Sequence, residues 1–316
     1  MGYIILTMLL FLAIISYFRV ANHYNIIDRP NHRSSHSITT LRGGGIIFWF
    51  TSATYFVQHI EGSYWFFIAI TLISLVSFWD DIQNLPNTIR ISAHFIAISL
   101  IFFDLNIFSL FSFSGIALTY VVAIGILNAY NFMDGINGIT GLYTLVVMGF
   151  LWLADLYVQH FVDIDLIIYP IIASLVFLFF NFRKNAKCFA GDVGSIAIAF
   201  WIIFLLLKLI LATGSVTWIL FLAVYGIDTV CTIVHRLYLK QNIFKAHRMH
   251  FYQVLSNEYG IQHRIVSILY AGMQAIVCLT VILNFMAGAN SLLSAIILLP
   301  LLLIYSLKFR LIRRKV

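Results

Sequence analysis

Residues 194–212 have the sequence GSIAIAFWIIFLLLKLILA, in which Lys208 is the only charged side chain. A helix needs roughly 20 apolar residues to cross the hydrocarbon core of a bilayer. A transmembrane β-strand would alternate polar and apolar side chains, and the run Ile203–Leu207 does not. This stretch therefore predicts a transmembrane helix.

The composition extends that prediction to the whole chain of 316 residues. Hydrophobic residues make up 62% of it and charged residues 10%, and the mean hydropathy is +0.97. A soluble domain is about half apolar and a quarter charged, so soluble, disordered, collagen-like and disulfide-scaffold classes are excluded. The cysteines Cys188, Cys231 and Cys278 are too widely spaced to indicate a disulfide framework or a zinc site.

Eleven stretches are long and apolar enough to be predicted as spans, so we expect an all-α polytopic membrane protein. No polar segment is long enough for a separate soluble domain, which predicts one integral-membrane domain over residues 1–316. The first stretch has no basic residues before its apolar run and is expected to remain as a span. The stretches are 1–18, 44–60, 63–79, 89–105, 114–130, 138–154, 166–182, 194–212, 215–234, 264–286 and 289–307.

The basic residues indicate how these spans are oriented. With eleven crossings, 18 of the 19 Lys and Arg fall in segments on one side of the membrane, and Lys208 is the exception. The positive-inside rule then predicts an outer N-terminus and a cytoplasmic C-terminus. The net charge of +7 is thus explained by topology, and no nucleic-acid partner is expected.

Paired acids follow the third predicted span, where Asp80 and Asp81 are followed by Arg90. These acids could be a solvated helix end. However, carboxylates at a helix C-terminus oppose the helix dipole by about 0.3–1 kcal/mol each. Because acids that flank a membrane span are costly, the pattern favours a functional role.

The segment 128–138, NAYNFMDGING, concentrates polar residues between the fifth and sixth spans. An N-cap with a glycine turn would explain one of them, Asp134 or Asn137, and not the rest. Asn128 and Asn131 are three residues apart and share a face of a helix. Such a face can present oxygen ligands to a hard cation.

A third polar cluster, Gly191-Asp192-Val-Gly194-Ser195, opens the eighth predicted span. Asp192 is a plausible plain N-cap. Alternatively, the glycine-flanked helix start is a phosphate site, with the carboxylate beside it to hold Mg²⁺.

The largest predicted cytoplasmic loop contains His247, Arg248 and His250. It could be a basic surface loop or a lipid-headgroup patch. The absence of a third His or Cys nearby argues against zinc. Arginine with paired histidines suits a diphosphate through charge-assisted hydrogen bonds. The segment Asp28–Gly45 adds a further polar loop with a weaker indication of anion binding.

Together the clusters place magnesium-type ligands and phosphate-type ligands on one membrane face. Spans surround them, so a lipid could approach from the side. This arrangement predicts an enzyme that joins a water-soluble phosphate donor to a lipid. A membrane glycosyltransferase that releases UDP is an alternative. A secondary transporter is disfavoured, because its acids should lie near mid-bilayer.

The clusters, in this order over residues 27 to about 253, resemble the polyprenyl-phosphate N-acetylhexosamine-1-phosphate transferases of glycosyltransferase family 4. The strings Arg33-Ser-Ser-His36 and His247-Arg-x-His-x-Tyr-Gln253 are similar to the branch that initiates O-antigen. The resemblance departs at Asn137, where many bacterial members carry Asp.

The resemblance implies transfer of N-acetylhexosamine-1-phosphate from a UDP-N-acetylhexosamine to undecaprenyl phosphate, with release of UMP. It implies a multi-pass enzyme of the bacterial cytoplasmic (inner) membrane, facing the cytoplasm, that catalyses the first membrane step of O-antigen or other envelope polysaccharide synthesis. The amino sugar, direct attack versus a covalent aspartyl intermediate, and a homodimeric state are left open.

The same resemblance assigns roles to residues. Mg²⁺, with Mn²⁺ as a substitute, is the implied cofactor, and membrane lipids surround the site. The implied catalytic residues are Asp80 and Asp81, the substrate-binding residues are Arg90, Asn128, Asp134, His247, Arg248 and His250, and the metal ligands are Asn131 and Asp192.

Overall fold

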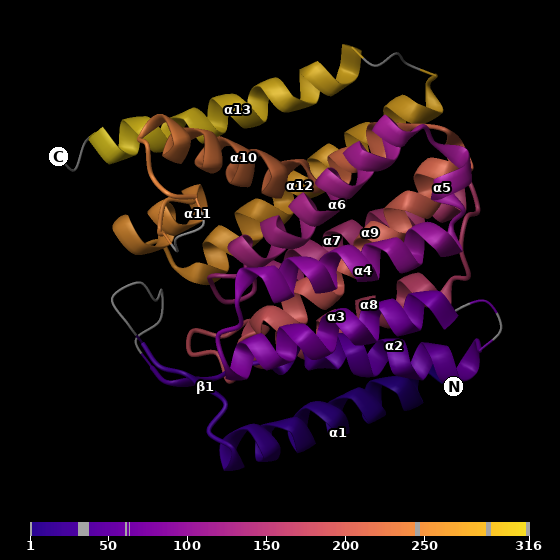
Figure 1. Cartoon of the computed structure of the whole chain (residues 1–316). Coiled ribbons are helices and arrows are strands. Elements are labelled where there is room, and N and C mark those ends of the chain that lie inside the picture. Colours follow the sequence, from indigo (N-terminus) through magenta and orange to yellow (C-terminus); the bar gives the residue numbers. More distant parts are fainter. Residues whose placement is uncertain are drawn as a thin grey trace.

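The computed structural model describes residues 2–30, 38–60, 62, 64–243, 247–288 and 292–313. The Arg33–His36 string therefore lies outside the described residues. Long helices run side by side along one direction and form the body of the molecule (Figure 1). The helices are α1 (Gly2–His23), α2 (Ile47–Gln58), α3 (Tyr64–Ile82), α4 (Asn87–Asp104), α5 (Ile107–Leu110), α6 (Phe113–Met133), α7 (Ile139–Tyr157), α8 (Asp165–Asn181), α9 (Gly191–Thr213), α10 (Ala223–Tyr238), α11 (Phe251–Gln253), α12 (His263–Met286) and α13 (Leu292–Arg313).

Every predicted span contains a helix in the structure. By length and apolar composition, seven helices within the described residues can cross a membrane. The chain is thus a multi-pass membrane protein built almost wholly from helices. The count of eleven crossings is not confirmed, since α2 has 12 residues and α8 has 17. The orientation of the termini also remains a prediction.

The apolar stretch 194–212 lies within α9, the central helix. It packs against α2, α3, α6 and α7, and every residue from Val193 to Leu206 is buried. A helix that is apolar all round is typical of a protein interior as well as of a lipid-facing span. Here its apolar surface is covered largely by other helices, so α9 is a scaffold for whatever lies at its ends.

The described residues include one small sheet, at the left-hand end in Figure 1. Strands β1 (Ile27–Asp28) and β2 (Thr40–Leu41) pair antiparallel, with Ile27 opposite Leu41. The amide of Phe189 donates to the carbonyl of Leu41 at 2.8 Å. The strands therefore fasten the N-terminal loop to the segment that leads into α9.

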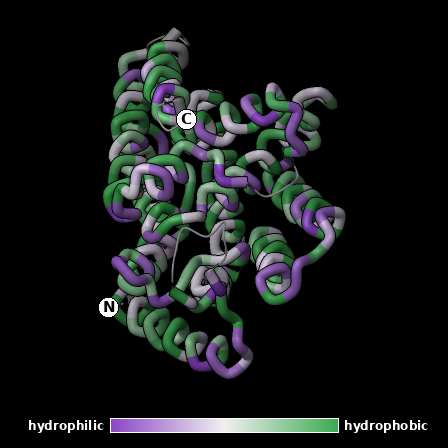
Figure 2. Tube along the Cα trace, turned by 90° about the vertical axis from the view of Figure 1, so that its left-hand side faces the viewer, coloured by the Kyte–Doolittle hydropathy of each residue, from purple (hydrophilic) through white to green (hydrophobic). Residues whose placement is uncertain are grey.

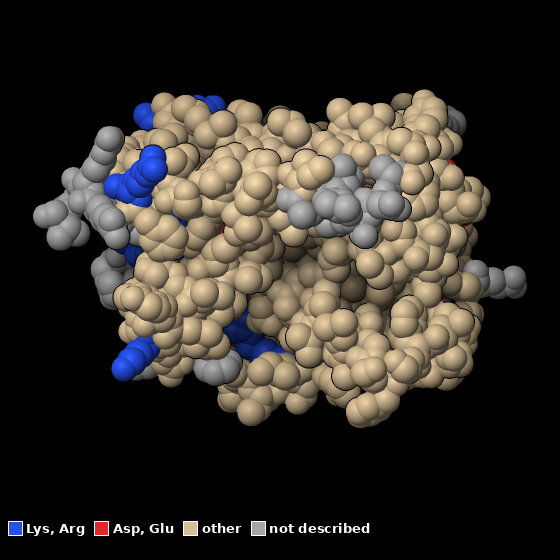
Figure 3. Space-filling view, turned by 90° about the horizontal axis from the view of Figure 1, so that it is seen from above, with Lys and Arg blue, Asp and Glu red and all other residues tan. Residues whose placement is uncertain are grey.

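Hydrophilic residues lie at the same end (Figure 2). Figure 2 shows hydrophilic residues on the loops and helix ends, while hydrophobic residues dominate the helix bodies. In the view from above, Lys and Arg lie toward the left-hand end and the middle of the surface is hollowed (Figure 3). We therefore call the end that carries β1 and α11 the basic end.

Candidate active site at the basic end

Backbone contact between two glycines brings the N-terminal loop onto α9. A Cβ atom on Gly45 would overlap the Cα atom of Gly194, and one on Gly194 would lie within 2.5 Å of the Cα of Gly45. The amide of Gly45 also donates to the carbonyl of Ala190 at 3.0 Å. Only glycine permits this approach. It places Arg42, three residues earlier, beside the first turn of α9.

Asp81 caps that first turn from another helix. Its carboxylate accepts the backbone N–H of Asp192 at 2.9 Å and of Val193 at 3.0 Å, and Nε of Arg42 lies 2.7 Å away. The Asp81 side chain is 0% exposed. Although it lies at the unfavourable C-terminal end of α3, it lies at the favourable N-terminal end of α9. Both oxygens are therefore already used within the protein.

Asp192 lies between two guanidinium groups. Nη2 of Arg42 is 3.3 Å from Oδ1 of Asp192, and Nη2 of Arg90 is 3.6 Å from Oδ2. Arg90 also pairs with Asp80 at 3.2 Å, and Asp80 accepts the N–H of Leu85 at 2.6 Å. The Asp192 side chain is 17% exposed, more than either paired acid. It is the acid of this group most open to a ligand.

Residues of the second polar cluster approach this group from α6. Nδ2 of Asn131 donates to Oγ of Ser195 at 3.3 Å, and Asn131 and Asp80 both lie within hydrogen-bonding reach of Asp192. Asn128 instead donates to the carbonyl of Ile124 in its own helix. The structure thus brings Asn131 to the acids, whereas none of the contacts described for Asn128 joins it to them.

Asp134 follows the last residue of α6. It accepts a hydrogen bond from Oγ1 of Thr140 at 2.5 Å. Burial raises the pKa of the Asp134 carboxyl to about 7, against the opposing effect of the Thr140 hydrogen bond. The carboxyl can therefore hold or release a proton near neutral pH.

Asn137 has a structural task that a carboxylate could not perform. Its Nδ2 donates to the carbonyl oxygens of Arg183 at 2.8 Å and Lys184 at 3.3 Å. An aspartate here would turn an acceptor toward two acceptors. The departure from the family pattern is therefore matched by the local backbone.

Residues His247–Gln253, here called the histidine loop, pack against the end of α6. The hydroxyl of Tyr252 donates to the carbonyl of Phe132 at 2.9 Å, and the rings of His247 and His250 have centroids 4.8 Å apart. Burial, followed by the positive neighbours, lowers the pKa of His247 to about 3. Without a ligand His247 is therefore neutral at pH 7. Arg248 is half-buried on the same loop.

Two residues that contact this site are not evident from the sequence motifs. Arg42, which pairs with Asp81 and Asp192, had been assigned only to a polar loop. Asp228, which bonds to His250, lies within the predicted span 215–234. A single acid in an apolar span was the available signal, because such acids are rare and usually functional.

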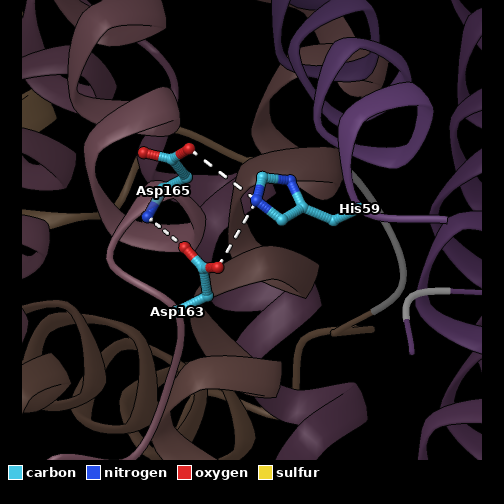
Figure 4. Close-up of side chains that lie close together, drawn as sticks. All are labelled: His59, Asp163 and Asp165. Atoms are coloured by element: carbon cyan, nitrogen blue, oxygen red, sulfur yellow. Dashed lines mark hydrogen bonds and ion pairs between the residues drawn. The ribbon is translucent and has the colours of Figure 1, made fainter. Parts of the chain in front are cut away.

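A separate cluster lies at the opposite end of the helices. Nε2 of His59, after α2, is 3.4 Å from Asp163 and 3.8 Å from Asp165, before α8 (Figure 4). The donor atoms of these three residues lie within 4.8 Å of one another. The side chains are partly exposed, as in ordinary surface ion pairs. This cluster contains none of the predicted magnesium ligands.

The chain is also similar to a known family. Residues 63–210 match the model described as glycosyl transferase family 4. That range ends before the histidine loop. It contains Asp80, Asp81, Arg90, Asn128, Asn131, Asp134 and Asp192.

Individual proteins are also similar to the chain. It is 30% identical over 194 residues to a probable undecaprenyl-phosphate N-acetylglucosaminyl 1-phosphate transferase of Bacillus subtilis (strain 168), which covers 60% of this chain and 51% of the relative. It is 26% identical over 301 residues to the undecaprenyl-phosphate alpha-N-acetylglucosaminyl 1-phosphate transferase of Salmonella typhi, covering 86% and 77%. A phospho-N-acetylmuramoyl-pentapeptide-transferase of Streptococcus pneumoniae serotype 2 (strain D39 / NCTC 7466) is 39% identical over 75 residues, covering 24% and 23%. The match thus spans about half the length of the Bacillus relative and about three quarters of the Salmonella one.

Proposed function

Because residues 63–210 match the model described as glycosyl transferase family 4 and the chain is similar to undecaprenyl-phosphate N-acetylglucosaminyl 1-phosphate transferases, we propose that it transfers N-acetylhexosamine-1-phosphate from a UDP-sugar to undecaprenyl phosphate and releases UMP. The observation that carries the proposal is the position of Asp192 between Arg42 and Arg90 at the basic end of an apolar bundle. Carboxylate and guanidinium groups side by side are what a phosphoryl transfer requires, since the protein contributes mainly positioning and charge neutralisation.

The donor set fits Mg²⁺, the cofactor of our proposal. Asp192 offers a carboxylate that is partly exposed, and Asn131 keeps its amide oxygen available while Nδ2 donates to Ser195. Oxygen ligands of this kind are those that Mg²⁺ prefers. When bound there, the ion would neutralise charge on the diphosphate that is split.

Both substrates carry phosphate, and different basic residues would bind each of them. Arg90, oriented by Asp80, would bind the phosphate of the lipid acceptor, and Arg42 lies on the other side of Asp192. Bidentate guanidinium contacts suit phosphoryl oxygens. Arg248 and His250 would hold the donor diphosphate, with neutral His247 contributing hydrogen bonds. Asn128 and Asp134 complete the proposed substrate contacts.

The two paired acids would have different tasks. Asp81 is fully buried with both oxygens bound, so we assign it to holding Arg42 and the start of α9. Asp80 is then the acid that assists the attacking phosphate. If the reaction has a covalent step, Asp80 rather than Asp81 is the proposed nucleophile.

The charge distribution supports a location in the bacterial cytoplasmic membrane with the basic end in the cytoplasm. The whole chain would act as one catalytic domain. A role in the first membrane step of O-antigen or envelope polysaccharide synthesis follows the same proposal. Whether the enzyme is a homodimer is a matter for measurement of its mass in detergent.

The test traces the β-phosphate of the UDP-sugar. Purified protein is incubated with UDP-N-acetylglucosamine and related UDP-amino sugars labelled in the β-phosphate, undecaprenyl phosphate and Mg²⁺. Label should enter the lipid fraction while UMP accumulates. Release of UDP with an unlabelled lipid would show a glycosyltransferase that attacks the anomeric carbon. Absence of turnover with every UDP-amino sugar would contradict the proposal.

A further inference from the structure

Asp228, on α10, is a buried acid that the proposed chemistry does not use. Its carboxylate is the meeting point of five hydrogen-bond partners from three parts of the chain. Oδ1 accepts from the amide of Phe251 at 2.9 Å and from Oγ1 of Thr232 at 3.2 Å, and it lies 3.3 Å from Nδ1 of His250. Oδ2 accepts from the hydroxyl of Tyr270 at 2.7 Å and from the amide of Tyr252 at 3.3 Å.

His250 is held by this carboxylate through one ring nitrogen only. The residue is 2% exposed, and within the described part of the chain its Nε2 has no hydrogen-bond partner. A buried polar atom without a partner destabilises a protein. The unpaired Nε2 is therefore best explained by a ligand that reaches it.

The ring packs against the residue that follows Asn131 on α6. Its centroid is 6.1 Å from that of Phe132, the residue after Asn131. The Tyr252 hydroxyl fastens the loop to the carbonyl of the same Phe132. A ligand held at Asn131 and Asp192 would therefore lie close to the loop that carries His250.

Resting on the proposed function, we propose that Asp228 is a positioning residue that orients His250, so that its Nε2 contacts a phosphoryl oxygen of the nucleotide diphosphate. By accepting from Nδ1–H, the carboxylate selects the ring orientation and leaves Nε2 as the contact atom. When the ring carries a second proton, Nε2–H donates to the phosphoryl oxygen, and the carboxylate balances the positive charge.

A purely structural role for Asp228 predicts different behaviour. If it served only to cap the backbone at Phe251 and Tyr252, its loss would lower stability, and its effect on catalysis would not depend on His250. If it acts through the ring, its effect on catalysis should vanish once the ring is gone. Asp228→Asn is the suitable change, because the amide keeps an oxygen for the backbone N–H groups.

The experiment is a double-mutant cycle on the full chain in detergent, with Asp228→Asn, His250→Gln and the double variant. Asp228→Asn should lower kcat/KM for the UDP-sugar by about 10–100-fold, the usual cost of losing a partner that orients a ligating histidine. In the His250→Gln background the same change should cost less than about threefold. The proposal would be overturned if the two single changes had multiplicative effects on kcat/KM in the double variant. A wild-type kcat/KM for Asp228→Asn would also overturn it.

Thr229→Val is the matched control. Thr229 is the next residue on α10, is also buried, and its Oγ1 has no hydrogen-bond partner within the described residues. This variant should keep the wild-type kcat/KM. If it lost as much activity as Asp228→Asn, the effect would be one of helix packing, and the proposal would fail.

A second measurement needs no substrate. In ¹⁵N-histidine-labelled protein, the ring signals of His250 are identified by their loss in His250→Gln. They should show protonated Nδ1 in the wild type and a changed ring state in Asp228→Asn. Unchanged signals would overturn the orienting contact. Failure of wild-type turnover with these signals as expected would instead count against the proposed reaction.

Discussion

Asp81 accepts the backbone N–H of Asp192, so the carboxylate that ends α3 also fixes the helix start that carries the proposed metal ligand. The 2.9 Å bond joins residues 111 positions apart. One acid of the pair is thereby a structural part of the site, and its neighbour Asp80 is directed toward Arg90. The two acids should consequently respond differently to substitution.

Asp81→Ala should destabilise the protein, because it removes a helix cap and leaves Arg42 without its closest partner. Loss of a cap costs about 0.5–2 kcal/mol. Asp80→Asn should keep the wild-type unfolding temperature and lower turnover by orders of magnitude. Thermal unfolding in detergent and a UMP-release assay separate the two effects. Equal unfolding temperatures for both variants would contradict the cap.

Gly191→Ala should also damage the start of α9. Gly191 has φ of +72°, and an added Cβ would lie 2.5 Å from Oδ2 of Asp81. Both the left-handed backbone and the contact disfavour a side chain. Gly226→Ala on α10, where a Cβ meets nothing within 4 Å, is the control and should remain folded and active. Comparable unfolding temperatures for the two variants would refute this reasoning.

Asp192→Ala should abolish turnover and leave the protein folded, since the side chain is assigned to ligand binding. EDTA should inhibit the wild type, and added Mg²⁺ or Mn²⁺ should restore activity. Activity is followed as transfer of β-phosphate label to lipid. Full turnover in EDTA, or a fully active Asp192→Ala, would remove the metal assignment.

Asn137→Asp, which introduces the acid that the family resemblance leads us to expect, should lower stability rather than improve activity. The new carboxylate would face the carbonyl oxygens of Arg183 and Lys184, and two donated hydrogen bonds would be lost. Asn128→Asp is the comparison, because Asn128 makes one bond within its own helix. An Asn137→Asp protein as stable as the wild type would show that the loop adapts.

The pH dependence of stability should carry a contribution from Asp134. Its pKa is raised from 3.8 to about 7 by burial, so the folded state holds the proton more tightly than the unfolded state. Between about pH 4 and pH 7 the unfolded state ionises first, and stability falls as pH rises. Asp134→Asn should lack this fall. The measurement is the unfolding temperature of the wild type and of Asp134→Asn from pH 5 to pH 8. Parallel curves would contradict a contribution from Asp134.

The sequence predicted the helical class and the helix positions because long apolar runs leave few alternatives. It grouped Asp80, Asp81 and Asp192, which do lie together, but it left out Arg42, and it included Asn128, which bonds within its own helix. It could not predict that α9 is enclosed by other helices, because an apolar surface is equally stable against lipid. The different roles of Asp80 and Asp81 were hidden for another reason: the partners of Asp81, which are Arg42, Asp192 and Val193, are distant in sequence.

The state of the histidine loop was beyond the sequence as well. His247 and Arg248 look alike as candidate cations, yet burial leaves His247 neutral. Asp228 lies 22 residues before His250, and only folding shows that they touch. Acids and bases can be identified from the chain, whereas their charges depend on the surroundings that packing creates.

The contact between Gly45 and Gly194 couples the position of the N-terminal loop to that of α9 at the basic end. A joint made of backbone atoms has no side-chain rotamers to absorb movement, so a tilt of either segment must be followed by the other. We therefore expect Arg42 and Asp192 to keep their relative position when the surrounding bilayer thins or thickens. Adaptation to membranes of different thickness should fall to the outer helices, such as α1 and α13, without reaching the residues proposed to bind phosphate.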